Sequence, residues 1–307
     1  MKYLFLLLFF PTNLVASEVY YSVWGPLNYS IFQPNDNGKP KPLVVAIHGC
    51  KEKPGVFESV IELQNYAKKY DFSIVYPEQS TLRNPDHCWN WNLPLNQWRS
   101  GEPAMVVGLV EMLKSDLNAS QIYVLGMSSG GALTAILGSC YPDVFSAVGI
   151  HSGVQYLAGG VWDANSALVE GSKQDPRKAA EIATHCMIRK NKKSIPAIIM
   201  HGAQDKRVIE RNGELVAEQF IALNDLLDDN TANNSISTTP THETHGVTDQ
   251  GYHFKELTFG NNLVKYISIE QLSHAWSGGK DIVVQGTPHG DSKGPNASEF
   301  MLKFFFE

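Results

Sequence analysis

The feature that most constrains the fold of this chain is the segment 126–130, Gly-Met-Ser-Ser-Gly, which follows a short apolar run beginning at Tyr123. An apolar run, a Gly-x-Ser-x-Gly turn and a segment of small residues predict a strand, a sharp turn and a helix. Glycine on both sides of the serine leaves room where the strand and helix backbones approach each other. This turn would hold Ser128 at a strand end as a candidate nucleophile. The alternative is a glycine-rich turn in which the serine only caps the helix.

Strand and helix patterns alternate along the rest of the chain. Apolar runs typical of buried parallel strands occur at 43–47, 72–77, 123–127, 145–150 and 197–202. Helical spacing or composition occurs at 57–70, 104–113, 131–139, 209–227 and 298–306. This alternation predicts an α/β fold with a mostly parallel sheet and helices on both faces. With the serine turn it indicates the α/β-hydrolase fold, in which residues 18–307 form a single domain and 154–194 a small cap.

Three further segments carry weaker patterns. Residues 19–24 and 29–32 alternate around Gly-Pro and predict an edge hairpin, and 252–257 and 263–269 predict a second hairpin. The polar tract 228–250 is expected to be a mobile surface loop. A metal site is conceivable at the histidines in or beside this tract, but scattered histidines in a polar loop are more often surface residues, and no metal is expected. These histidines are His242, His245 and His253.

The N-terminus differs in kind from the rest of the chain. Met1-Lys2 precedes an unbroken apolar and aromatic run over 3–10, and small residues follow near Ser17. This pattern predicts a secretory signal peptide over residues 1–17, the alternative being an uncleaved core strand or anchor. No other segment approaches the length of a membrane span, so membrane insertion is not expected. The net charge of −6 gives no reason to expect nucleic acid as a partner.

The chain has four cysteines: Cys50, Cys88, Cys140 and Cys186. Their spacing does not match a metal site, and an even number fits disulfides in a secreted protein, for which three pairings exist. The loops after the strands 43–47 and 72–77 should meet at one sheet edge, so we expect a Cys50–Cys88 bond. The other two cysteines would then pair. The alternative is four buried thiols, which a signal peptide disfavours.

A serine hydroxyl needs a base, and the base needs a carboxylate to orient it. In this fold the chain order is serine, acid, histidine. Asp205 follows the strand 197–202, and His274 lies in a small-residue loop between the last strand and the last helix. We therefore predict Asp205 as the acid and His274 as the base, the alternatives being a turn aspartate and an ordinary loop histidine. Asp163 and Asp281 are weaker candidates because the first lacks a preceding strand and the second follows the histidine.

The tetrahedral intermediate of such a reaction needs two hydrogen-bond donors for its oxyanion. The N–H of Ser129, directly after the nucleophile, is the first candidate. The second should come from the loop after the strand 43–47, which begins His48-Gly49-Cys50. We predict the N–H of Cys50 as this donor, and a Cys50–Cys88 bond would hold its loop in place.

Several motifs together resemble one known family. They are His48-Gly49-Cys50, Tyr76-Pro77-Glu78-Gln79, Cys88-Trp89-Asn90-Trp91, Gly126-Met127-Ser128-Ser129-Gly130-Gly131, Tyr141-Pro142-Asp143-Val144-Phe145, His201-Gly202-Ala203-Gln204-Asp205 and His274-Ala275-Trp276-Ser277-Gly278-Gly279. From about Leu43 to the C-terminus the sequence is similar to poly(3-hydroxybutyrate) depolymerase-like esterases, which are related to secreted feruloyl and acetylxylan esterases. The resemblance implies the same Ser128, Asp205, His274 and Cys50 roles. It also implies that Trp89, Trp91 and Trp276 lie near the substrate, the alternative being core or loop packing.

These patterns favour a secreted serine esterase that hydrolyses polymers or oligomers of 3-hydroxyalkanoates and needs no cofactor. The alternative within enzymes is a feruloyl or acetylxylan esterase, since the catalytic residues would be the same and the pocket would decide. A peptidase is disfavoured because nothing indicates a propeller-like second domain. From a different class, the protein could be an inactive hydrolase fold that binds polyester or glycan, which the complete set of catalytic residue types disfavours.

Overall fold

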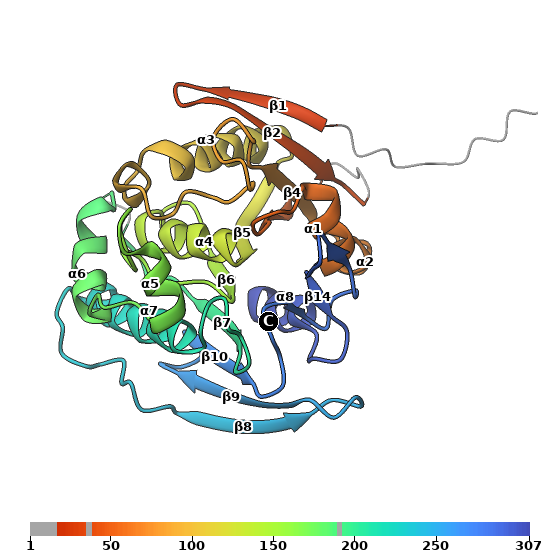
Figure 1. Ribbon diagram of the computed structural model, residues 1–307. Helices are drawn as coiled ribbons and strands as arrows, with labels where there is room; N and C mark the ends of the chain where they lie inside the picture. Colours follow the sequence, from red (N-terminus) through yellow and green to blue (C-terminus); the bar gives the residue numbers. More distant parts are fainter. Residues whose placement is uncertain (1–16, 35–38, 189–191) are drawn as a thin grey trace, which may run out of the picture.

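The computed structural model describes residues 17–34, 39–188 and 192–307, in which ten strands form one central sheet (Figure 1). The predicted signal segment 1–17 lies outside the described residues except for Ser17, where the first strand begins. In spatial order the strands are β1 (Ser17–Ser22), β2 (Gly25–Phe32), β4 (Ser73–Glu78), β3 (Lys41–Ile47), β5 (Ala119–Met127), β6 (Ala147–His151), β7 (Ala197–Gly202), β10 (Val264–Ile269), β9 (His253–Phe259) and β8 (His242–Val247). Strands β1 and β8 form opposite edges of the sheet (Figure 1).

The centre of the sheet is parallel and its edges are antiparallel. Strands β4, β3, β5, β6, β7 and β10 pair in parallel. The hairpin of β1 and β2 and the antiparallel pair of β9 and β10 confirm both predicted hairpins. The carboxyl ends of the parallel strands therefore meet at one edge, where sites form in sheets of this kind.

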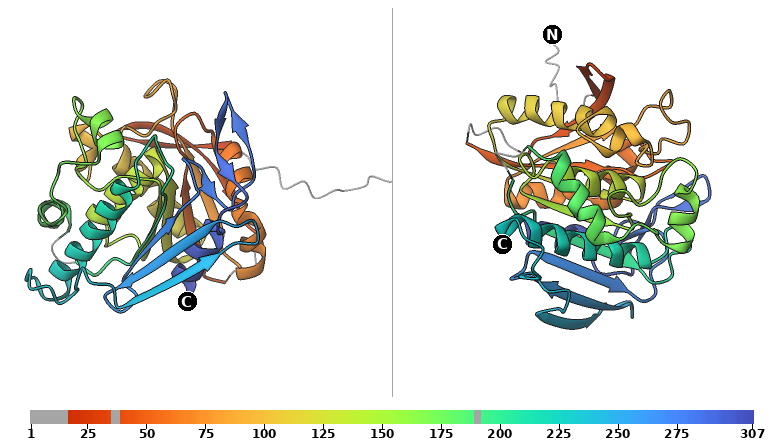
Figure 2. Two further views of the ribbon diagram at one scale, coloured as in Figure 1. Left: turned by 60° about the horizontal axis from the view of Figure 1, so that its bottom comes forward. Right: turned by 90° about the vertical axis from the view of Figure 1, so that its left-hand side faces the viewer.

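Helices cover both faces of the sheet. One face carries α3 (Gly101–Asp116), α4 (Ser129–Cys140), α6 (Pro176–Cys186) and α7 (Arg211–Asp229). The other face carries α1 (Pro54–Ile61), α2 (Leu63–Tyr70) and α8 (Ala297–Phe306). The right-hand view of Figure 2 shows α3 and α7 on the near side of the sheet. This mostly parallel sheet between two helix layers confirms the predicted α/β-hydrolase fold.

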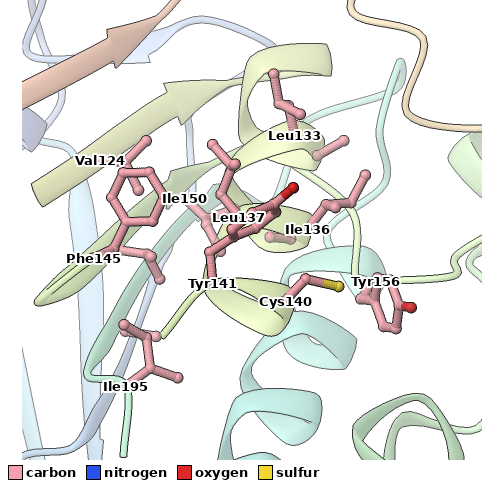
Figure 3. Packing of buried hydrophobic residues seen from close by; sticks show 14 of the residues in the cluster. Val124, Leu133, Ile136, Leu137, Cys140, Tyr141, Phe145, Ile150, Tyr156 and Ile195 are labelled. Atoms are coloured by element: carbon pink, nitrogen blue, oxygen red, sulfur yellow. The ribbon is translucent and has the colours of Figure 1, made fainter. Parts of the chain in front are cut away.

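Side-chain alternation along the strands produces one core on each face. In β3, Leu43 and Val45 pack into the core beneath α3 and α4, whereas Val44 and Ala46 pack into the core beneath α1 and α8. Successive strand residues point to opposite faces, so a strand buried on both sides reads as a continuous apolar run. Figure 3 shows the first core around α4, where its side chains lie beside those of β5 and β6.

The C-terminal segment adds two small two-stranded sheets. Strand β11 (Trp276–Ser277) pairs in parallel with β14 (Gly290–Asp291). Strands β12 (Val283–Val284) and β13 (Thr287–Pro288) form an antiparallel pair. This segment follows His274 directly, and its residues Thr287, Pro288 and His289 lie beside the candidate site.

Two sequence predictions are corrected by the structure. The helical pattern 57–70 is two helices, because Glu62 adopts a left-handed backbone conformation with φ of 50° between α1 and α2. The expected loop 228–250 contains the edge strand β8, which pairs antiparallel with β9. Its side chains are almost all exposed, so the strand has no apolar face to signal it. Over the described residues, no helix combines the length and apolar character that a membrane span requires.

Candidate active site

The turn between β5 and α4 places Ser128 at the carboxyl edge of the sheet. Its φ of 55° and ψ of −121° lie in a region that non-glycine residues rarely adopt. A Cβ on Gly126 would lie 2.5 Å from the Gly130 carbonyl oxygen, and one on Gly130 would lie 2.2 Å from the carbonyl oxygen of Ile47. Only glycine fits at these two positions, which is why the sharp turn carries glycine on both sides.

The three predicted catalytic side chains form one hydrogen-bonded chain. The Nε2 atom of His274 lies 3.0 Å from the Oγ atom of Ser128, and its Nδ1 atom lies 2.6 Å from Oδ2 of Asp205. Because a carboxylate only accepts, Nδ1 carries the proton and Nε2 offers its lone pair to the hydroxyl. The Ser128 hydroxyl therefore contacts a potential base, the imidazole of His274, and this imidazole is in turn held by the carboxylate of Asp205.

Asp205 is held in its ionised form by its surroundings. Its Oδ1 atom accepts backbone N–H groups from Arg207 and Val208, each at 2.9 Å. Burial alone would raise the pKa of Asp205, but the hydrogen bond from His274, the nearby His201 and the Val208 N–H together bring it below its usual range. An ionised acid fixes the orientation of His274 and stabilises its protonated form.

The two weaker acid candidates lie elsewhere. Asp163 precedes α5 (Ala164–Glu170), and its carboxylate accepts the N–H of Gly160. The carboxylate of Asp281 accepts the backbone N–H and the hydroxyl of Ser292. Within the described part of the chain, neither of these aspartates is a hydrogen-bond partner of His274.

The loop after β3 brings Cys50 to the same place. Contacts at Gly49 help to hold this loop: its N–H donates to Oε2 of Glu52 at 2.7 Å, and its carbonyl oxygen lies 2.7 Å from Nδ1 of His48. Cys50 and Ser129, the predicted oxyanion donors, both line the hollow that contains Ser128. Ser129 is also the first residue of α4, where backbone N–H groups have no partner within the helix.

Both disulfides follow the expected pairing. Cys50 is bonded to Cys88, and Cys140 is bonded to Cys186, so the described residues contain no free cysteine. The first bond joins the loop after β3 to the loop after β4. The second joins the end of α4 to the end of α6. Two disulfides fit an oxidising compartment outside the cytosol.

A hollow of about 300 Å³, called here the inner hollow, opens beside Ser128. Its apolar lining comes from several parts of the chain. These residues are Trp91, Met127, Ala132, Val154, Leu168, Val169, Val208 and Pro288. Asn165, Leu168 and Val169 belong to α5, so the predicted cap 154–194 covers the site through this helix. Helix α6 packs instead into the core with α4 and α7.

The three tryptophans expected near the substrate lie in different environments. Trp91 lines the inner hollow. Trp89 is buried, and its indole N–H donates to the carbonyl oxygen of His48 at 3.1 Å. Trp276 is fully buried and stacks on His151 with ring centroids 5.0 Å apart. Core packing, the alternative reading, therefore describes the side chains of Trp89 and Trp276, which do not line the inner hollow.

Sequence reasoning missed several polar groups of the site. Glu52 and His289 are both buried and line the inner hollow, and Oε1 of Glu52 lies 2.8 Å from Nδ1 of His289. His151 and His201 are buried beside the predicted catalytic residues, and burial is the main cause that lowers the pKa of each, that of His151 to about 3. Glu52 lies two residues after the predicted donor Cys50. This proximity is the feature of the sequence that could have indicated the pair of Glu52 and His289.

The three histidines in or beside the polar tract lie on the edge strands β8 and β9. In the described ranges, no group of three or more histidine, cysteine, aspartate or glutamate residues could hold a metal ion. His245 lies on β8 directly opposite Lys255 of β9, and its Nε2 atom lies 3.0 Å from Oε1 of Glu243. A lysine at this position would repel a bound cation.

Comparison with known proteins assigns the family. The model of the esterase PHB depolymerase family matches residues 27–243, which is more than half of the chain. The chain belongs to this family. The match contains Ser128 and Asp205, whereas His274 lies after it.

Individual known esterases and depolymerases share moderate identity with the chain. Poly(3-hydroxyalkanoate) depolymerase C of Paucimonas lemoignei is 29% identical over 201 residues, which cover 64% of this chain and 48% of the relative. Feruloyl esterase B of Neurospora crassa is 33% identical over 153 residues, or 47% of this chain and 51% of the relative. The chain thus spans about half the length of these two relatives.

A solved structure shows the same fold over nearly the whole chain. Acetyl xylan esterase from Aspergillus awamori superposes with a TM-score of 0.73 and covers 94% of this chain and 98% of its own, at 18% sequence identity. At this identity the likeness establishes the α/β-hydrolase fold, and the substrate must be argued from the site.

Proposed function

We propose that this protein is a secreted serine esterase that hydrolyses oligomers or polymers of 3-hydroxyalkanoates through an acyl-enzyme. The observation that carries the proposal is the hydrogen-bonded chain from Ser128 Oγ through His274 to Asp205, at 3.0 and 2.6 Å. Membership of the esterase PHB depolymerase family supports ester hydrolysis, and the similarity to a poly(3-hydroxyalkanoate) depolymerase supports the substrate class.

The proposed reaction begins when Ser128 Oγ attacks the ester carbonyl carbon and His274 Nε2 takes the serine proton. The N–H groups of Cys50 and Ser129 would stabilise the negative charge on the tetrahedral oxygen. The C–O bond to the alcohol then breaks, and His274 delivers its proton to the departing oxygen. Water, activated by His274, attacks the acyl-enzyme, releases the carboxylic acid and restores Ser128. Asp205 stabilises the protonated imidazole in both halves.

The inner hollow supports a short acyl group. Its volume of about 300 Å³ and its apolar lining by Trp91, Val154 and Leu168 suit a small aliphatic unit with a few polar contacts. Asn165 and Val169 of the α5 helix also line this hollow. A hydroxyalkanoate unit of short chain length fits this description.

A feruloyl or acetylxylan esterase is the second candidate within enzymes. Similarity to feruloyl esterase B favours it. All three reactions would use the same catalytic residues, so only the pocket separates them. An inactive fold that binds polyester or glycan is disfavoured because the serine, histidine and aspartate are in hydrogen-bonding contact.

One panel of substrates decides among these functions. We would measure kcat/KM on the trimer of 3-hydroxybutyrate, on methyl ferulate and on acetylated xylan, with Ser128→Ala as the blank. The proposal expects the trimer to be hydrolysed fastest. A higher value for ferulate or for acetylated xylan would assign the second candidate. Rates equal to the blank on all three substrates would support a binding protein.

A further inference from the structure

A second hollow is also lined by His274. This outer hollow has a volume of about 690 Å³ and shares four residues with the inner hollow. The shared residues are Arg207, His274, Thr287 and Pro288. Gln204, Lys206 and Ser273 complete its lining. Both hollows therefore border the imidazole that contacts Ser128.

The direction of proton transfer assigns the outer hollow to the alcohol half of the ester. The imidazole that takes the proton of Ser128 must deliver it to the departing alcohol oxygen, so the alcohol lies on the His274 side of the serine. Cys50 and Ser129, the proposed oxyanion donors, line only the inner hollow. The inner hollow thus receives the acyl group, and the alcohol extends past His274 into the outer hollow.

The charges along this path are positive. Lys206 and Arg207 line the outer hollow, and no aspartate or glutamate of the described residues does so. Lys51 lines the inner hollow, where the carboxylate of Glu52 is already engaged by the Gly49 N–H and by His289. This concentration of cations contrasts with the net charge of −6 of the whole chain.

Lys206 and Arg207 are available to a ligand. Both residues are exposed, and neither has a carboxylate partner in the described ranges of the chain. The backbone N–H of Arg207 donates to Oδ1 of Asp205 at 2.9 Å. The proposed catalytic acid therefore holds the backbone from which the Arg207 side chain extends. A guanidinium in this position presents several donors to a carboxylate.

We propose that Lys206 and Arg207 bind a free carboxylate on the alcohol half of the ester, a proposal that rests on the function proposed above. In an oligomer of hydroxy acids, the alcohol half of the last ester is itself a hydroxy acid with a free carboxylate. The enzyme would therefore prefer oligomers over neutral esters and cleave next to the carboxylate end. One water is consumed, the last acyl C–O bond breaks, and a hydroxy acid is released with the shortened oligomer acid.

The test compares two dimers of 3-hydroxybutyrate that differ in one charge. One is the free acid at pH 7, and the other is its primary amide, which is neutral and keeps a single ester bond. We expect kcat/KM to be about tenfold higher for the acid, since two exposed charged contacts contribute about three- to fivefold each. Raising the salt from about 0.01 M to about 0.5 M should reduce this preference.

Variants assign the preference to the two residues. Arg207→Gln should lower the acid-to-amide ratio of kcat/KM about fivefold, and Arg207→Lys, which keeps the charge, should retain most of it. Lys206→Gln combined with Arg207→Gln should bring the ratio close to one. The matched control is Arg177→Gln, an exposed arginine on α6 outside both hollows, which should leave the ratio unchanged.

Two results would overturn the proposal in different ways. If both dimers are hydrolysed at equal rates, or if the double variant keeps the preference for the acid, the carboxylate site is wrong while the oligomer esterase stands. If neither dimer nor the trimer is hydrolysed faster than by Ser128→Ala, the proposed function fails and the carboxylate site fails with it.

Discussion

The Nδ1 atom of His48 lies 2.7 Å from the carbonyl oxygen of Gly49. On the other side of the ring, the backbone N–H of Gln79 donates to Nε2 at 3.1 Å. An N–H cannot accept, so Nε2 is unprotonated and Nδ1 carries the proton that it donates to Gly49. The Gly49 carbonyl and the Cys50 N–H belong to one planar peptide group. His48 therefore fixes the direction of the N–H that we propose as an oxyanion donor.

This relationship predicts that replacing His48 lowers kcat. Replacing it by leucine removes the donor to Gly49 and should lower kcat about 10- to 100-fold with little change in KM, because the oxyanion forms only in the transition state. His48→Asn keeps an N–H donor on a short side chain and should recover part of the loss. Steady-state kinetics on a short nitrophenyl ester would measure both values. A loss confined to KM, or equal losses in the two variants, would argue against this role.

The two disulfides should differ in what they support. They close loops of 38 and 46 residues, so removing either should cost a similar free energy of unfolding, about 3–4 kcal/mol in the chain-entropy model. Only Cys50–Cys88 holds the proposed oxyanion loop. We expect the double variant Cys50→Ser with Cys88→Ser to lower kcat as well as stability, and Cys140→Ser with Cys186→Ser to lower stability alone. Kinetics and urea unfolding on both double variants check this, and equal kcat values would refute it.

Much of the fold and site could be predicted because the relevant patterns are local. The strands β3, β5 and β7 are apolar on both faces and end in residues with distinct chemistry. Ser128 follows one of these strands and Asp205 another, so their order along the chain already places them at one sheet edge. Disulfide pairing followed from the same reasoning, because Cys50 and Cys88 lie on loops that leave neighbouring strands.

Other parts could not be predicted because their causes are not local. Strand β8 is stabilised by backbone pairing to β9, and its exposed polar side chains look like those of a loop. Trp276 lies two residues after His274, yet it turns into the core against His151 and Phe57. His289 meets Glu52 only because the chain after β13 returns to the loop after β3.

Buried histidines should make the protein sensitive to mild acid. Burial is the main cause that lowers the pKa of His48, His151 and His201, that of His151 to about 3. Below about pH 6.5 the unfolded state binds protons that the folded state does not, so stability should fall by up to about 1.4 kcal/mol per pH unit for each histidine. Above about pH 6.5 these histidines do not make the free energy of unfolding depend on pH. The pKa of Asp205 is lowered, so its ionised form stabilises the folded state, and this stabilisation is lost only at much lower pH.

Urea unfolding at pH 7, 6 and 5 would measure this slope. His151→Gln should unfold at lower urea at pH 7 but lose stability less steeply on acidification. The control His242→Gln, at an exposed position of β8, should keep the slope of the parent protein. Equal midpoints at pH 7 and pH 5 in the parent protein would contradict the account.

Replacement by alanine should lower the free energy of unfolding at Gly130 and raise it at Gly55. A Cβ at Gly130 would lie 2.2 Å from the backbone oxygen of Ile47, whereas a Cβ at Gly55, in α1, would have no atom within 4 Å. Gly130→Ala should therefore lower the free energy of unfolding by about 1–3 kcal/mol and disturb the turn that holds Ser128. Gly55→Ala should raise it by up to about 1 kcal/mol with unchanged activity. Thermal unfolding of the two variants is the check, and stabilisation by Gly130→Ala would count against the geometry of the turn.

The central claim is that Ser128, activated by His274 and Asp205, is the nucleophile, and the most direct test is kcat/KM of Ser128→Ala on a short nitrophenyl ester. The variant loses only one oxygen at a position that tolerates a smaller side chain, so circular dichroism and the unfolding midpoint should match those of the parent. The account predicts a loss of roughly 10⁴- to 10⁶-fold. A folded Ser128→Ala protein that keeps more than about a tenth of the parent value would contradict it.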